Sequence, residues 1–350
     1  MAHGIRSDKG GPVPTKTVIA IGLLMVVPGT GGAQPATNAA SEARTPWGTP
    51  DLQGIWDFRT VTPLERPSEL AGKDVLTEEE AAVQEQLIAE ERVDRVPEQG
   101  DTGFYNQFWL DQGTEVVPTK RTSLIVDPPD GRLPPLTSEA QRRAERRAAS
   151  WERPIRERVA GYLPNRIADG PEDLGLAERC LLGFNSGPPM LPSFYNNAMQ
   201  LFQTPEYVVI LNEMVHDARV IPLDGRAHLP ADLRQWMGDS RGRWDGDTLI
   251  VETTNFTDKT TSFSPEITSG IGSGETLHLT ERFTRIDGDT LLYGYTVDDP
   301  VTFMQRFSAE LPMTTTDWPL IEYACHEGNY AMPNTLAGAR TEEAAAQESR

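Results

Sequence analysis

Glu213 and Glu281 are the candidate acid or base of a catalytic site, because each falls on the apolar face of a predicted β-strand. Glu213 shares the parity of the apolar residues of strand 207–213, and Glu281 shares that of strand 277–283. Since successive side chains point to opposite faces, both glutamates are predicted to point into the core. Burial raises the pKa of a carboxyl group, as a general acid near neutral pH requires. The alternative is a buried ion pair with one of the available arginines, Arg219, Arg241, Arg243 or Arg282.

Histidines are the predicted proton-transfer partners of these carboxyl groups. Apart from one near the N-terminus, they all lie in the β-rich part of the chain, as His216, His228, His278 and His326. His216 belongs to segment 212–219, which gathers four ionisable groups, and His326 follows a cysteine directly. We predict that His216, His278 and His326 act in proton transfer. The alternative for each is a hydrogen-bonded structural histidine.

Two arginines and three further side chains are predicted to hold a substrate. Arg219 and Arg241 would stabilise anionic charge that develops on it. Trp236 and Trp244 would form an aromatic wall for an apolar or ring-bearing ligand, and Asn255 would add a polar contact. A packed core is the alternative explanation of the tryptophans.

Metal and cofactor motifs are missing from the sequence. There is no His-Glu-x-x-His or Cys-x-x-Cys motif, and the histidines are ten or more residues apart. We expect no metal site, although strands distant in sequence can assemble zinc ligands. No Walker or dinucleotide-binding glycine pattern occurs, so no cofactor is expected.

The two cysteines, Cys180 and Cys325, are predicted to form one disulfide. An isolated pair in an exported protein is expected to be bridged, with two separate buried thiols as the alternative. Closing so long a loop would stabilise the fold by roughly 4–5 kcal/mol in the chain-entropy model. The bridge would pin the Gly/Pro-rich connection 162–192 and hold His326 and Glu327 against the body of the fold.

The first 33 residues have the pattern of a secretory signal peptide. A basic segment precedes the apolar run 18–27, and small residues at 31–33 offer a cleavage site before Gln34. The apolar run is too short to span a bilayer, which takes about 20 residues. A membrane anchor or a buried strand is the alternative. We therefore expect an exported protein, periplasmic or extracellular, without a membrane span.

The composition is acidic, with a formal net charge of −20 at pH 7. Such a charge repels phosphate backbones, so nucleic acid is not an expected partner. The expected partner is a small, partly apolar molecule, and the sequence says nothing of the oligomeric state.

The rest of the chain is predicted to form one β-rich domain over 46–340, after a flexible leader at 34–45. Helical insertions are expected near 76–93 and 138–160, and a flexible tail at 341–350. Three Asp-Gly pairs punctuate the β-rich part, at 224–225, 245–246 and 287–288. Asp-Gly between alternating segments is a strong hairpin signal, because both turn residues adopt positive φ. The pattern predicts an antiparallel up-and-down meander of six to nine strands, closed as a barrel or strongly curved.

Two sequence stretches resemble a large family of uncharacterised exported bacterial proteins. The first is Pro-Trp-Gly-x-Pro-Asp-Leu-Gln-Gly-Ile-Trp at 46–56, and the second is Gly-Asp-Thr-Leu-Ile-Val-Glu-Thr-Thr-Asn-Phe at 246–256. The resemblance covers most of the mature chain and implies no activity. The Gly-x-Trp that opens the meander is also similar to the start of a lipocalin or calycin barrel. It implies, by analogy of fold alone, a barrel that holds a ligand.

Together these features predict a secreted enzyme that acts on a partly apolar small molecule in a β-barrel pocket. It would be a lyase, isomerase or hydrolase that uses acid–base chemistry. One alternative is a non-catalytic periplasmic carrier of hydrophobic small molecules. Another is a structural or assembly protein of the cell envelope.

Overall fold

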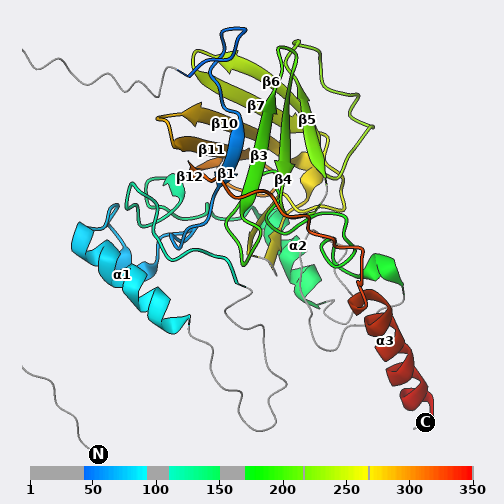
Figure 1. Cartoon of the computed structure of the whole chain (residues 1–350). Coiled ribbons are helices and arrows are strands. Elements are labelled where there is room, and N and C mark those ends of the chain that lie inside the picture. Colours follow the sequence, from blue (N-terminus) through cyan, green and yellow to red (C-terminus); the bar gives the residue numbers. More distant parts are fainter. Residues whose placement is uncertain (1–42, 93–109, 150–169, 216, 267–268, 349–350) are drawn as a thin grey trace, which may run out of the picture. The chain divides into compact units, whose positions relative to one another are not determined.

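The computed structural model describes residues 43–92, 110–149, 170–215, 217–266 and 269–348 (Figure 1). Its helices are α1 (Glu78–Glu91), α2 (Ser138–Ala149) and α3 (Ala331–Glu348), with short 3-10 turns at Ser68–Leu70, Pro171–Asp173 and Gly274–Thr276. Its strands are β1 (Gly54–Asp57), β2 (Ile125–Asp127), β3 (Ala198–Gln203), β4 (Tyr207–Asn212), β5 (Ala218–Pro222), β6 (Asp239–Asp245), β7 (Thr248–Thr254), β8 (Phe263–Glu266), β9 (Ser269–Ile271), β10 (His278–Arg285), β11 (Thr290–Asp298) and β12 (Phe307–Thr315).

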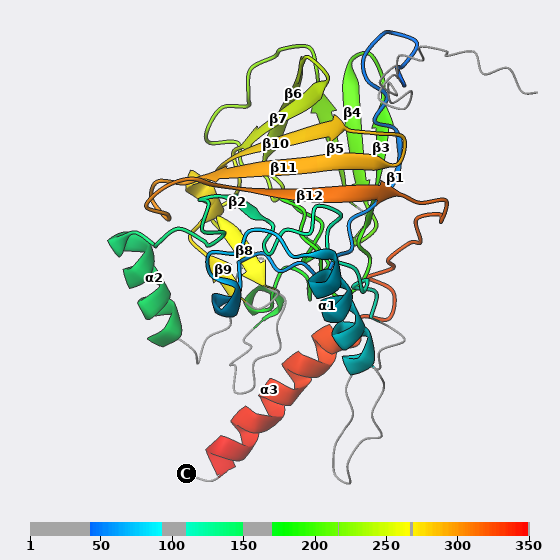
Figure 2. The same ribbon diagram turned by 90° about the vertical axis from the view of Figure 1, so that its left-hand side faces the viewer.

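Ten of these strands form one antiparallel sheet that is nearly closed as a barrel, which confirms the predicted mainly β fold. The order is β5-β4-β3-β1-β12-β11-β10-β7-β6, and β2 pairs with β12 beside this path. Figure 2 shows β12, β11, β10, β7 and β6 as successive strands of one wall. Strands β8 and β9 pair separately.

The two ends of this order, β5 and β6, meet along a seam. Eight successive antiparallel pairings connect them, so they run in the same direction, and no hydrogen-bonded pairing joins them in the described chain. Side chains fill one part of the seam. A Cβ atom at Gly242 would lie 2.6 Å from Leu223 Cδ2 and 3.0 Å from Ile221 Cγ2, so only glycine leaves them room.

The seam also explains why one of three predicted turns is wrong. Asp245-Gly246 joins β6 to β7 and Asp287-Gly288 joins β10 to β11, as predicted. Asp224-Gly225 instead lies near the start of the long segment 223–238, which connects β5 to β6. A tight turn reverses the chain, so it cannot connect two strands that run in the same direction.

Inward-facing side chains fill the barrel with a single hydrophobic core. On β11, alternate residues are buried, from Leu291 to Val297, as a period of two requires. Trp56 on β1 is fully buried, and its indole N–H donates to Leu52 O at 2.9 Å. The core also holds the large aromatic side chains of Phe58, Phe256, Phe263, Phe283, Tyr293, Tyr295, Phe303 and Phe307.

One end of the core is plugged by the segment 182–190, in which all but one residue are buried. Met190 is fully buried, and its backbone N–H donates to the Tyr293 hydroxyl at 3.1 Å. Just before this plug, Cys180 is bridged to Cys325 with a Cα–Cα distance of 5.7 Å, so the predicted disulfide is present.

Helices occur within both predicted insertions, and their bounds differ from the predicted ones. Thr77 forms a capping box with Glu80 and begins α1, while residues 150–160 of the second range lie outside the described residues. Residues 341–348 of the predicted flexible tail are helical and belong to α3. Its alanines and glutamates are strong helix formers. The predicted signal and most of the predicted leader, residues 1–42, lie outside the described residues. No described helix is long and apolar enough to cross a membrane.

Candidate functional site

Glu281 lies inside the barrel, as its parity predicts, and forms a buried network with Arg219 and Tyr293. Arg219 Nη1 donates to Glu281 Oε2 at 2.6 Å, and Nη2 donates to Oε1 at 2.9 Å. The Tyr293 hydroxyl donates to the same Oε1 at 2.9 Å. The ion pair considered as the alternative for Glu281 is therefore present, with Arg219 as its partner.

Burial and mutual attraction set the charges in this network. Burial lowers the pKa of Arg219, but the negative charge and hydrogen bonds of Glu281 outweigh it, so that the pKa is raised overall. Burial, together with the nearby charge of Glu281, holds the pKa of Tyr293 well above its ordinary value. Both Glu281 oxygens accept hydrogen bonds, and the side chain is 0% exposed. Removing one partner of such a pair would leave the other charge buried and uncompensated. The catalytic role of Glu281 stays a prediction.

The structure corrects the face assigned to Glu213. In β4 the inner residues are Val208, Ile210 and Asn212, while the residues of opposite parity are half-buried on the outer face. Parity could not show which face of β4 points into the core, because both faces of this strand carry apolar side chains. Glu213 itself follows β4 and is half-buried, and its Oε1 accepts the Ile321 N–H at 3.3 Å. Burial raises the pKa of Glu213, and the hydrogen bond from Ile321 partly opposes that shift.

The predicted histidines that the structure describes do not surround Glu281. His278 is exposed on the outer face of β10, and His326 is exposed in the segment after Cys325. His216 lies outside the described residues. His228 Nδ1 lies 3.0 Å from Asp239 Oδ2, and this carboxylate also accepts the Leu229 N–H at 2.9 Å. The proton-transfer roles of His216, His278 and His326 remain predictions.

The predicted substrate-binding residues are also dispersed. Arg241 Nη1 donates to Asp239 Oδ1 at 2.6 Å, and Trp244 packs against the core at the far end of β6. The Asn255 side chain donates to the carbonyls of Leu229, Pro230 and Leu233, which holds the loop before β6. Trp236 and Arg219 line a hollow of about 460 Å³ at the β5–β6 seam.

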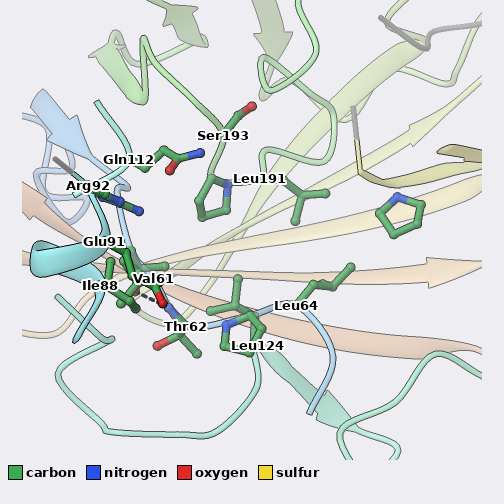
Figure 3. A pocket seen from close by; sticks show the side chains of 14 residues that line it. Val61, Thr62, Leu64, Ile88, Glu91, Arg92, Gln112, Leu124, Leu191 and Ser193 are labelled. Carbon is green, nitrogen blue, oxygen red and sulfur yellow. Dashed lines mark hydrogen bonds between the residues drawn. The ribbon is translucent and has the colours of Figure 1, made fainter. Parts of the chain in front are cut away.

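A different cavity, which sequence reasoning missed, is the strongest candidate for a binding site (Figure 3). It has a volume of about 410 Å³. Five parts of the chain line it: the segment after β1, the end of α1, the segment before β2, residues 191–193 just after the plug, and β8. Its apolar side chains are Val61, Pro63, Leu64, Ile88, Leu124, Leu191, Pro192 and Pro265. Its polar side chains are Thr60, Thr62, Glu91, Arg92, Gln112 and Ser193.

Two anchors bring α1 to this cavity. Leu76, Ala81 and Val116 form a small hydrophobic cluster against which Val61 packs. Glu85, on the next turn of α1, accepts the Val116 N–H at 3.0 Å. These contacts therefore place the end of α1, with Arg92, at the cavity.

The polar groups of the cavity fall into two kinds. The Thr60 and Thr62 hydroxyls are already used, since Thr60 donates to Glu115 O at 3.0 Å and Thr62 accepts the Val117 N–H at 2.9 Å. Ser193 Oγ, by contrast, is buried without a hydrogen-bond partner among the described residues. A buried hydroxyl without a partner is costly, so a ligand group or a water molecule is expected to satisfy it.

Besides the exposed Glu91, the charged group that lines the cavity is the half-buried Arg92. Its Nη1 donates to Gly113 O, and no ion pair joins it to a carboxylate in the described part of the chain. Burial lowers the pKa of Arg92, because partial desolvation penalises its charge. In Figure 3, Arg92 and Gln112 lie on one side of the cavity, and Leu64 and Leu191 lie on the other. The cavity thus has one side with charged and polar groups, Glu91 among them, and another side that is apolar.

The chemistry of the donor groups does not indicate a metal centre. Among the residues described, no group of three or more His, Cys, Asp or Glu side chains could hold a metal ion. Comparison with protein-family models, curated proteins and solved structures finds no match to this chain. The resemblances to exported bacterial proteins and to lipocalins therefore stay predictions.

Proposed function

We propose that this protein binds a small amphipathic anion in the cavity beneath Arg92 and Leu191. The carrier, one of the alternatives in the sequence analysis, is therefore our leading function. The observation that carries it is Arg92, a half-buried guanidinium beside an apolar wall with no described carboxylate as its partner.

The shape and lining of the cavity favour a ligand with an apolar body and one anionic group. Its volume of about 410 Å³ falls within the range of about 300–1,000 Å³ usual for small-molecule sites. Burying an apolar chain against Leu64, Leu124 and Leu191 contributes roughly 25 cal/mol per Å² of surface removed from water. A carboxylate on the ligand would supply a negative partner for the positive charge of Arg92, through a charge-assisted hydrogen bond.

We also propose that the protein is exported and works in an oxidising compartment. Two observations support this: the signal-like N-terminal sequence and the Cys180–Cys325 bridge. Disulfides of this kind persist in the periplasm or outside the cell and are rare in the cytosol.

The experiment compares octanoate with 1-octanol by isothermal titration calorimetry on the purified protein. The two molecules share an apolar chain and differ in the charge of the head group. We expect octanoate to bind at least tenfold more tightly, and Arg92→Gln to remove that preference, because a hydrogen bond to a charged group contributes about 1.5–3 kcal/mol. Arg243→Gln is the matched control, since Arg243 is exposed and does not line the cavity. Equal binding of both molecules, or no binding of either, would refute the proposal.

Acid–base catalysis is a second candidate, and Glu213 supports it. Its carboxyl group is half-buried with a raised pKa, and Tyr323 stacks on Tyr195 in the adjoining segments, with ring centroids 6.2 Å apart. In a catalyst, Glu213→Gln would leave the fold intact and abolish turnover. The measurement is mass spectrometry of candidate ligands after incubation with each protein, and unchanged ligands with the wild type would exclude this second function.

A further inference from the structure

The hollow of about 460 Å³ at the β5–β6 seam borders a buried donor that no described group satisfies. Arg219 lines the hollow and is 4% exposed. Its two terminal nitrogens donate to Glu281, whereas its Nε atom is buried with no hydrogen-bond partner among the described residues. A buried donor without an acceptor is costly, so an acceptor atom that enters the hollow, from a ligand or from water, is expected to satisfy it.

Trp236 gives this hollow an aromatic wall, on a segment that main-chain contacts hold in place. Its side chain is half-buried. The N–H of the preceding residue, Gln235, donates to Asn255 O at 2.9 Å. Gly238 adopts a φ of +69°, and a Cβ atom there would lie 2.6 Å from Thr254 O, so the segment fits closely against the end of β7. A fixed backbone on both sides of Trp236 is the support that a binding site requires.

Ion pairs already neutralise three of the four charged side chains that line the hollow. The pairs are Arg219–Glu281 at 2.6 Å, Arg234–Glu275 at 3.5 Å and Asp239–Arg241 at 2.6 Å. The fourth side chain, Asp217, is exposed and has no ion pair in the described part of the chain. An exposed carboxylate attracts a cation only weakly, and the lining offers an anion no unpaired positive charge. The hollow therefore favours an uncharged ligand, unlike the cavity of Arg92.

We propose that this hollow binds a neutral sugar ring, stacked on the indole of Trp236. The C–H groups of a sugar form an apolar face, which suits the partly negative face of an aromatic ring. Each sugar hydroxyl both donates and accepts hydrogen bonds. The hydroxyls would therefore match the carboxylate of Asp217, the amide of Gln235 and the Nε atom of Arg219. The volume lies within the range of about 300–1,000 Å³ usual for small-molecule sites.

A sugar fits the hollow better than a flat heterocycle does. Most of the lining other than Trp236 is polar or charged: Asp217, Arg219, Arg234, Gln235, Asp239 and Ser240. A heterocycle is apolar on both faces, so stacking one face on Trp236 would leave the other against these polar groups or water. A sugar ring carries hydroxyl groups around its rim, where the polar side chains can reach them.

The experiment is fluorine NMR on protein labelled with fluorotryptophan, titrated separately with methyl glucoside, methyl galactoside and methyl mannoside. Trp236→Phe and Trp318→Phe assign two resonances by their disappearance. At least one glycoside is expected to shift the Trp236 resonance saturably and to leave the Trp318 resonance in place. Trp318 is the internal control because it is 79% exposed and does not line the hollow.

Alanine variants measure how much the aromatic wall contributes to binding. Saturation-transfer NMR, observed on the glycoside, gives the affinity of each unlabelled protein. Trp236→Ala should weaken binding by roughly tenfold, because it removes the aromatic surface against which the ring packs. The matched control Trp318→Ala should leave the affinity unchanged. The fluorine shift is measured on the wild type, so the test does not depend on how well Trp236→Ala folds.

Four outcomes would overturn the proposal. One is that no glycoside shifts the Trp236 resonance, which would leave water as the partner of Arg219 Nε. Another is an equal shift of the Trp236 and Trp318 resonances, which would mean non-specific contact. Tighter binding of methyl glucuronide would indicate a charged ligand, and tighter binding of adenosine would indicate a heterocycle. Octanoate should leave the Trp236 resonance unchanged, which separates this site from the cavity of Arg92.

Discussion

The barrel interior and the Arg92 cavity both place an arginine away from water, and they treat its charge in opposite ways. Inside the barrel, Arg219 meets a carboxylate in two hydrogen bonds, and Tyr293 adds a third bond to the same group. At the cavity, Arg92 has the Gly113 carbonyl as its described acceptor and borders an apolar wall. Breaking a neutralised buried pair is costly because it leaves one charge uncompensated, whereas a partly desolvated arginine with no described ion pair is available to a ligand. The following predictions test that contrast.

The largest expected effect is on the barrel interior. Glu281→Gln should destabilise the protein by about 3–5 kcal/mol, because it leaves the Arg219 charge buried and uncompensated. The free energy of unfolding from urea titrations measures this. Glu252→Gln is the control, since the Glu252 side chain is 42% exposed and lies 3.7 Å from its arginine partner, Arg243. If the two variants lose equal stability, the network does not have the role assigned to it.

Replacing both Arg219 and Glu281 tests whether the two side chains act as a pair. The double variant Arg219→Leu, Glu281→Leu should recover much of the loss, because a buried pair can often be exchanged for apolar residues at little cost. Urea titrations of both single variants and the double variant form a double-mutant cycle. Additive losses would show that the two side chains do not act as a pair.

Tyr293→Phe should have an intermediate effect, about 1–3 kcal/mol. It removes a donor to Glu281 and leaves the Met190 N–H buried without an acceptor. Because Met190 ends the plug, its amide should also exchange faster in this variant, which hydrogen exchange measures. Unchanged exchange at Met190 would mean that the hydroxyl does not hold the plug.

Arg92→Gln should leave the stability of the ligand-free protein nearly unchanged, within about 0.5 kcal/mol, as is usual for substitutions outside packed cores and networks. Its effect should appear in octanoate affinity instead. Thermal unfolding with and without octanoate separates the effect on stability from the effect on affinity. Without octanoate, the variant should unfold at the same temperature as the wild type. With octanoate, its unfolding temperature should rise less than that of the wild type. A large loss of stability without ligand would make Arg92 a structural residue.

The smallest expected effect concerns Glu213 and pH. Its pKa in the folded protein is raised above the unfolded value. Between the two pKa values, the folded state therefore holds more protons than the unfolded state does. The stability of the wild type should therefore fall from about pH 4.5 upward, through the folded pKa, by a small amount because the side chain is only half-buried. Glu213→Gln should lose this part of the pH dependence. Parallel pH profiles for both proteins would contradict the assigned shift.

Local sequence patterns predicted much of the fold. The alternation of segment 277–283 placed Glu281 inside the barrel, and two Asp-Gly turns were located correctly. The two cysteines had a single way to pair. Alternation failed at β4, where apolar residues occupy both faces, and at Asp224-Gly225, where the direction of the next strand decides the connection.

The cavity could not be predicted in the same way, because distant parts of the chain build it. Five distant residues come together only when the barrel, α1 and the segment after the plug are in place: Thr60, Arg92, Leu124, Leu191 and Pro265. No spacing in the sequence connects them. The predicted helix near 76–93 was the only local signal, and it did not show what the end of that helix would face.

The most direct test of the central proposal is a crystal structure of the protein with 8-bromooctanoate, in which anomalous scattering locates the bromine atom. We predict a bromine peak against Leu64, Leu124 and Leu191, with the carboxylate within hydrogen-bonding distance of Arg92. A bromine peak elsewhere on the protein, with the Arg92 cavity unchanged, would contradict the proposal.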